Sequence, residues 1–143
     1  MYRITTKSKT DMITTFEQQT KPLTDWERCT LLPAMVRELS QHRSSGNAIK
    51  SDHLAERMQI ATGQKPNGAR IRKVVNAIRI GGYLRCLSAT SDGYFVAANR
   101  AEIADCVLSL QQRAAQIWQV AEALKTQMDN VYPNNPQQTI NFE

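Results

Sequence analysis

The most regular hydrophobic pattern of the chain lies in its last third. Apolar or small side chains recur there at alternating spacings of four and three residues. This heptad pattern is typical of a helix that pairs with another helix along one seam. The seam comprises Ile103, Val107, Leu110, Ala114, Ile117, Ala121, Leu124 and Met128.

The pattern predicts a long helix over residues 99–128, with Asn99 as its N-cap and Glu102 three residues further on. A helix of this length extends about 45 Å at 1.5 Å per residue, which is longer than a small domain can cover. We therefore expect a homodimer that pairs through the seam. Parallel and antiparallel pairing both fit the sequence, and a helix that folds back on its own domain is the alternative.

Two shorter helical patterns lie in the first half of the chain. The first starts at a capping box of Thr24 and Glu27, and it contains Pro33, which predicts either a kink or a restart of the helix. The second is expected over residues 52–58, with Ser51 as its N-cap. The apolar positions of the first helix are Trp26, Cys29, Leu32, Val36 and Leu39.

A third helix is expected over residues 68–80, after the loop ATGQKPNG, and its two faces differ in character. The buried stripe follows the helical i, i+3, i+4, i+7 rule and comprises Ile71, Val74, Val75 and Ile78. On a helical wheel the opposite face comprises Ala69, Lys73 and Asn76, with Arg70, Arg72 and Arg79 on its flanks.

Two short strand patterns follow, over residues 83–88 and 94–98, with Ser91-Asp92-Gly93 as the turn between them. Residues 48–50 are short enough to be a third strand beside this hairpin. The order helix, strand stub, helix, turn, helix, hairpin is the layout of a winged helix-turn-helix. The sequence therefore predicts a mainly α fold with a small β-hairpin wing (α+β), followed by a long C-terminal dimerisation helix.

The tails of the chain are polar and lack helical or strand periodicity, which is typical of flexible segments. Ile140 and Phe142 stand in the C-terminal tail, which is either a docking peptide for a protein partner or a tail without a role. The expected parts are a flexible arm over residues 1–21, a winged-helix domain over 22–98, the self-association helix over 99–128 and a disordered tail over 129–143.

The distribution of charge points to a partner. The formal net charge is +5, and residues 57–91 contain seven Lys or Arg residues and no Asp or Glu. An acid-free basic segment inside a folded region favours a polyanion, here double-stranded DNA, whereas the alternative is a solvated face that keeps the protein soluble.

In a winged helix the third helix enters the major groove, and the wing lies along the backbone or the minor groove. Arg and Lys side chains can contact guanine, Asn can pair with adenine, and hydroxyl groups can donate to phosphates. The residues expected to bind DNA are Lys65, Asn67, Arg70, Arg72, Lys73, Asn76, Arg85, Ser88, Thr90 and Ser91.

The run ARIRKVVNAIRIGGYLRCLSATSDGYFVAANRAEI resembles the small winged helix-turn-helix proteins common in phages and prophages. The matching features are a basic helix, Gly82-Tyr83, the Ser-rich stretch 88–91, Gly93-Tyr94 and Asn99 before a long helix. The resemblance covers about residues 47 to 128. It implies a cytoplasmic DNA-binding protein, either a transcriptional regulator or an accessory factor of phage or prophage DNA metabolism, and not an enzyme.

Several classes of function lack support in the sequence. No nucleophile–base pair, phosphate-cradling glycine loop or carboxylate cluster is apparent, so an enzyme is not expected. Two histidines and no CxxC or HExxH motif make a metal site or a cofactor unexpected. We expect Cys29, Cys86 and Cys106 to be reduced thiols packed in the core of a cytoplasmic protein. No segment is apolar over the about 18 residues that a membrane span needs.

A winged helix can also bind protein instead of DNA, because a fold does not determine a function. In that alternative the chain is an adaptor that recruits a partner through its long C-terminal helix.

Overall fold

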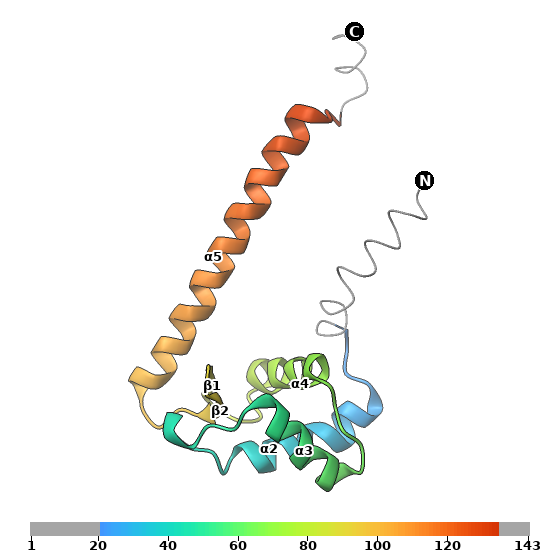
Figure 1. The fold of residues 1–143 in the computed structure, drawn as a ribbon, viewed down its shortest axis with the longest axis vertical. Coiled ribbons are helices and arrows are strands. Elements are labelled where there is room, and N and C mark those ends of the chain that lie inside the picture. Colours follow the sequence, from blue (N-terminus) through green and yellow to red (C-terminus); the bar gives the residue numbers. More distant parts are fainter. Residues whose placement is uncertain (1–20, 135–143) are drawn as a thin grey trace. The chain divides into compact units, whose positions relative to one another are not determined.

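The computed structural model of the chain describes residues 21–134. This part is mainly helical, with a two-stranded antiparallel hairpin and a long C-terminal helix (Figure 1), as predicted. The chain forms two compact units, residues 1–104 and residues 105–143. The predicted N-terminal arm, except for Lys21, and residues 135–143 of the predicted tail lie outside the described residues.

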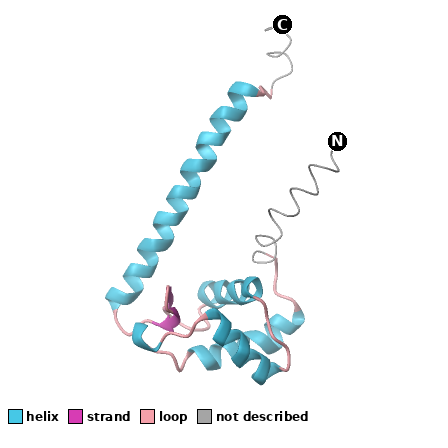
Figure 2. Cartoon of the chain, in the orientation of Figure 1, coloured by secondary structure: helices cyan, strands magenta, loops and turns pink. Residues whose placement is uncertain are grey.

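In the first unit the helical segments come first and one hairpin follows them, and Figure 2 distinguishes the helices from the strands by colour. They are η1 (Glu27–Leu31), α2 (Leu32–Leu39), η2 (Ser45–Asn47), α3 (Ser51–Thr62), α4 (Gly68–Gly81), β1 (Leu87–Thr90) and β2 (Gly93–Val96), after which α5 (Arg100–Val131) begins.

The first helix starts at the predicted capping box. The N–H of Thr24 donates to Glu27 Oε1 at 2.8 Å, and the N–H of Glu27 donates to Thr24 Oγ1 at 3.2 Å. Between the box and Pro33 the helix has the wider π form, in which the N–H of Leu32 donates to the carbonyl of Glu27 five residues earlier. A regular helix then restarts as α2, with Pro33 in its first turn, where the missing N–H of proline costs no hydrogen bond.

The π-helical turn changes which side chains of the first helix are buried. The extra residue per turn rotates the following residues, so that Leu31, Leu32, Met35 and Leu39 form the buried face. Cys29 is exposed, and the expectation that it packs in the core is wrong. A helical wheel with a constant period cannot anticipate this rotation.

The second predicted helix is longer than expected and begins differently. Ser51 is the first residue of α3, Lys50 is the N-cap, and no side chain caps this end. At the other end Thr62 precedes Gly63, which has a φ of 83° in the left-handed region and terminates the helix. The predicted loop ATGQKPNG therefore contributes its first two residues to α3.

Helix α4 follows the prediction closely. Asn67 is its N-cap, and its side-chain oxygen accepts from the N–H of Arg70 at 2.8 Å. Gly82 ends the helix with a φ of 70°. The predicted stripe on α4, Ile71, Val74, Val75 and Ile78, is almost completely buried.

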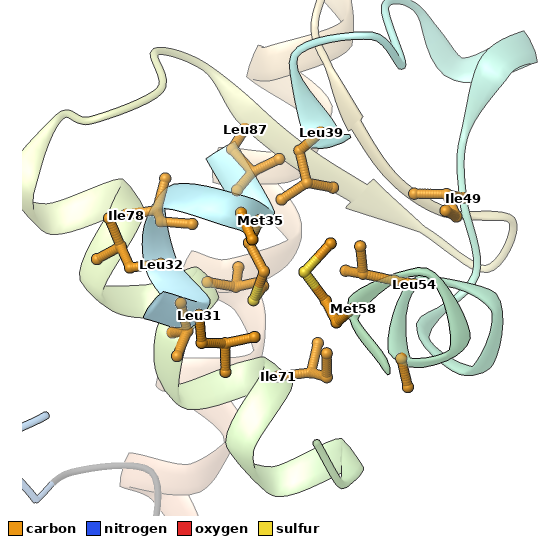
Figure 3. Packing of buried hydrophobic residues seen from close by; sticks show 14 residues of the cluster. Leu31, Leu32, Met35, Leu39, Ile49, Leu54, Met58, Ile71, Ile78 and Leu87 are labelled. Atoms are coloured by element: carbon orange, nitrogen blue, oxygen red, sulfur yellow. The ribbon is translucent and has the colours of Figure 1, made fainter. Parts of the chain in front are cut away.

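These helices and the hairpin share one hydrophobic core (Figure 3). Met35 of α2 and Leu54 of α3 are completely buried, and Ile71 of α4 packs in the same cluster. The hairpin contributes Leu87 to this core, and Ile49 packs at the edge of the core near α3. The hairpin is therefore supported by the three helices, as a two-stranded unit must be in water.

The hairpin begins later than predicted. Residues 83–86 form turns, and β1 starts at Leu87, because Cys86 has a φ of 59° that interrupts the extended backbone. Thr90 pairs with Gly93, so the connecting loop is only Ser91 and Asp92. Cys86 is exposed, which corrects its predicted place in the core.

The predicted third strand is present as a single bridge. Ile49 and Tyr94 exchange two backbone hydrogen bonds, of 2.9 and 2.8 Å. A second bridge joins Arg43 to Val96, so that β2 has β1 on one side and these two bridges on the other.

Helix α5 starts at the predicted cap and runs three residues past its predicted end at Met128. Asn99 Oδ1 accepts from the N–H of Glu102 at 3.0 Å. Glu102 in turn accepts from the N–H groups of Ala98 and Ser45 and from the hydroxyl of Ser44. The hydrogen bonds from Ala98 and Ser45 lower the pKa of this carboxyl group to about 2, and the first turn of α5 belongs to the first unit.

Gly93 is the position of the hairpin that tolerates a side chain least. Its φ is 123°, and a Cβ atom would lie 2.2 Å from the carbonyl oxygen of Ile49. We expect Gly93→Ala to reduce the free energy of unfolding by about 2 kcal/mol or more, through backbone strain and loss of the bridge. Urea unfolding measures this change.

Gly46→Ala is the matched control, because no atom lies within 4 Å of a Cβ added there and its φ is not in the left-handed region. The free energy of unfolding should stay within about 0.5 kcal/mol of the wild type. Equal effects of the two substitutions would contradict the proposed clash at Gly93.

Candidate nucleic-acid interface

The basic residues of α4 fall into two groups, and one group is bound within the protein. Glu27 is 2% exposed, and its two carboxylate oxygens accept from two residues of this helix. Lys73 Nζ lies 2.7 Å from Oε1, and Arg70 Nε lies 2.7 Å from Oε2. The guanidinium of Arg70 also stacks on Trp26, 4.8 Å from the ring centroid. Thr24, Glu27, Arg70 and Lys73 are called the Glu27 cluster below.

The Glu27 cluster corrects the prediction for Lys73. The helical wheel places this residue opposite the buried stripe, yet it is only 7% exposed. The reason is that α4 is covered on a second side by η1, which carries Glu27. Lys73 therefore cannot contact DNA without leaving a buried carboxylate, and the same carboxylate engages the Nε of Arg70.

The electrostatics of the cluster keep Glu27 ionised. Burial by itself raises the pKa of a carboxyl group, because the charged form loses water. The hydrogen bonds from Lys73, Arg70 and the Thr24 N–H outweigh that effect and lower the pKa of Glu27 from 4.5 to about 2. At neutral pH the cluster holds two positive charges and one negative charge.

The second group of α4 residues faces solvent. Arg72 and Asn76 are both exposed, and they lie four residues apart, one turn along the same side of the helix. A Cβ atom added at Gly68 would lie 3.3 Å from a guanidinium nitrogen of Arg72. The side chain of Arg72 therefore extends over the first turn of α4. These positions agree with the predicted outer face.

The hairpin lies within electrostatic reach of this side of α4. Tyr94 of β2 is partly buried, which raises the pKa of its hydroxyl, while the positive charges of Arg79 and Arg72 act in the opposite direction. Arg79 also donates from Nε to the carbonyl of Leu87 at 2.8 Å. Arg79, which the helical wheel places on a flank of the outer face, thus joins α4 to β1.

A shallow hollow of about 340 Å³ lies between the start of α3 and the tip of the hairpin, and we call it the hairpin hollow. Lys50 is not among the residues predicted from the sequence, because only the Ile49–Tyr94 bridge places it beside the hairpin. The lining residues are Lys50, Ser51, Asp52, Ala89, Thr90, Ser91, Gly93 and Tyr94.

The remaining residues predicted to bind DNA are also partly exposed and partly buried. Thr90 and Ser91 are exposed at the hairpin turn, and Lys65 and Arg85 are exposed in the segments before and after α4. Ser88, by contrast, is completely buried in β1, with a hydroxyl that has no hydrogen-bond partner. The prediction that Ser88 contacts DNA is wrong, because Ser88 lies on the buried side of β1 and the turn of the hairpin begins three residues further on, at Ser91.

Asn67 is exposed, but its side-chain oxygen is engaged as the N-cap of α4. The capping contact by itself explains why asparagine occupies this position, whether or not the protein binds DNA. Asn67 is also among the residues predicted from the sequence to bind DNA, and that stays a prediction.

Comparisons with protein-family models, with curated proteins and with solved structures find no match to this chain. None of the helices within residues 21–134 is both long and apolar enough to cross a membrane. In the same described part, no three His, Cys, Asp or Glu side chains gather in a group that could hold a metal ion.

The Glu27 cluster generates a stability prediction with a defined pH dependence. Replacing Glu27 with Gln leaves two cations without their buried counter-charge, and we expect a loss of about 3 kcal/mol at pH 7. The folded-state pKa of Glu27 is lowered, so its contribution is complete above about pH 4.5 and disappears as the pH falls to about 2. Urea unfolding at several pH values measures both effects.

Asp25→Asn is the matched control, because the Asp25 side chain is 93% exposed and its ion pair with Arg28 lies at the surface. That variant should unfold within about 0.5 kcal/mol of the wild type at every pH. If E27Q and D25N had the same free energy of unfolding at pH 7, the prediction that the Glu27 cluster stabilises the packing of α4 against η1 would be wrong.

Proposed function

We propose that this chain binds duplex DNA as a winged helix, with α4 in the major groove and the β1–β2 hairpin as the wing. The observation that carries the proposal is the pair Arg72 and Asn76, exposed one turn apart on a helix anchored along its other sides. Arginine can contact guanine O6 and N7 through two hydrogen bonds, and asparagine can contact adenine N6 and N7 in the same way.

Contacts to the phosphate backbone come from residues around this pair. Lys65 precedes α4, and Lys50, Thr90 and Ser91 line the hairpin hollow, where hydroxyl groups and an ammonium group can donate to phosphate oxygens. Arg85 adds a charge in the segment between α4 and the hairpin. Asp52 and Asp92 lie at or next to the hollow and oppose the binding of an anion, so the attraction depends on Lys50, Lys65 and Arg85 together with Arg72.

The Glu27 cluster supports the proposal by its rigidity. A helix that reads bases must be held in a fixed orientation, and two charged hydrogen bonds to a buried carboxylate hold α4 against η1. In this proposal Arg70 and Lys73 position the helix, whereas Arg72 and Asn76 read the bases.

The cytoplasmic location, the phage or prophage origin and the role as regulator or accessory factor stay predictions. The alternative function is a protein-binding adaptor, which the exposed apolar side chains of α5 favour. Salt-dependent affinity for DNA separates the two functions.

We expect fluorescence anisotropy with a random-sequence duplex to show binding that weakens steeply as salt is added. The variant K65A/R72A should lower the slope of log affinity against log salt by at least about 0.9, the amount expected for the lost phosphate contact of Lys65, and the loss of Arg72 should relax the preference for the base that it contacts. Asn76→Ala should leave that slope almost unchanged and alter the sequences selected from a random library.

The control variant R28A/R37A removes the same charge from exposed positions on η1 and α2. It should retain the slope of the wild type. A wild type without salt-dependent affinity, or a control that loses as much as K65A/R72A, would overturn the assignment to α4. Alanine at Arg70 or Lys73 is not a clean test, because it also breaks the Glu27 cluster.

A further inference from the structure

The second unit is a helix with an uncovered apolar seam. Six large seam side chains of α5 are between 41% and 70% exposed within the single chain. The seam continues beyond its predicted end to Val131, whereas Ile103 belongs to the first unit and is partly buried there. The exposed members are Val107, Leu110, Ile117, Leu124, Met128 and Val131, and Ala114 and Ala121 lie between them.

We propose that a second copy of this chain covers the seam, with its α5 antiparallel and the pairing centred on Gln119. The centre follows from the extent of the exposed seam, since Gln119 lies midway between Val107 and Val131. In this register each seam residue of one copy meets one of the other. The layers join Val107 to the partner's Val131, Leu110 to the partner's Met128, Ala114 to the partner's Leu124 and Ile117 to the partner's Ala121.

The sizes of the side chains favour this direction. In the antiparallel register Ala114 meets the partner's Leu124, and Ala121 meets the partner's Ile117. Each of these layers therefore contains one small and one large aliphatic side chain, and their volumes are similar. In a parallel pair each residue meets its own copy, so that two alanines share one layer and two isoleucines or leucines the next. Such a pair alternates voids with bulky layers, which costs packing energy.

The flanks of the seam fit the same register. Trp118 and Val120 are 67% and 56% exposed, and they stand on the two sides of the seam next to its centre. Antiparallel pairing about Gln119 places each of them beside the same residue of the partner, which widens the apolar contact at its middle. In a parallel pair Trp118 would lie beside Arg113 and Val120 beside Lys125 of the other copy.

The exposed area is sufficient for a stable dimer. Eight large apolar side chains, six on the seam and two on its flanks, bury roughly 100 Å² each, or on the order of 800 Å² per chain. That is the area per partner of a standard stable interface. A homodimer through this helix is expected from the sequence, and the direction and register are the additional inference; neither depends on DNA binding.

The first experiment measures distances between spin labels in the full-length chain. Labels are attached to cysteines at Asp105 or Gln119, two exposed positions on the side of α5 away from the seam, after the native cysteines are replaced. Antiparallel pairing about Gln119 separates the two 105 positions by about 42 Å along the pair axis and places the two 119 positions at the same level. Because the labels face away from the partner, we expect about 25 Å between them at 119 and about 45 to 50 Å at 105. Similar distances near 25 Å at both positions would show a parallel pair, and a distance at 105 that differs from the expected value by about 10 Å would show a different register. Either result overturns the proposal.

The second experiment keeps the native cysteines and uses sedimentation equilibrium. In the proposed register Ala114→Leu crowds the partner's Leu124 and should weaken the dimer about tenfold or more, whereas A114L/L124A exchanges the two sizes and should restore it. In a parallel pair A114L fills a void and strengthens association, which would overturn the antiparallel direction.

The variant L110D/I117D should be monomeric with an unchanged first unit, because both residues lie in the second unit. A wild type that is monomeric at all concentrations, with its seam covered by its own domain or by another protein, would overturn the proposal. Loss of DNA affinity with retained dimers would instead contradict the proposed function alone.

Discussion

The arrangement of the first unit depends on one buried carboxylate. Glu27 is removed from water and stays charged only because Lys73, Arg70 and the N–H of Thr24 donate to it. These contacts join the start of the first helix to the middle of α4 across more than forty residues of sequence. They also determine which basic side chains of α4 remain available at the surface.

Local signals predicted most of the fold. The capping box at Thr24, the N-cap of α5 at Asn99 and the buried stripe of α4 are confirmed, because each depends on residues within one or two helical turns. The errors arise where distant contacts or backbone geometry intervene. The π-helical turn before Pro33 exposes Cys29, and the left-handed conformation of Cys86 delays β1 to Leu87.

The candidate interface was predicted less completely, for related reasons. Arg72 and Asn76 are exposed as the helical wheel indicates, but a wheel describes a helix in isolation and cannot show that η1 covers Lys73. Lys50 was missed because it reaches the hairpin only through the pairing of its neighbour Ile49 with Tyr94. Charge along the sequence located the basic region, and tertiary contacts decided which of its members are accessible.

The positions of the two tryptophans have a practical consequence. Trp26 packs under the guanidinium of Arg70 in the first unit, and Trp118 lies exposed on α5 in the second. They are the only indoles of the chain, one in each unit. The protein therefore contains two tryptophan fluorophores whose emission can be separated by a single Trp→Phe replacement. One reports whether the carboxylate of Glu27 still holds its cations, and the other reports whether the long helix is in water.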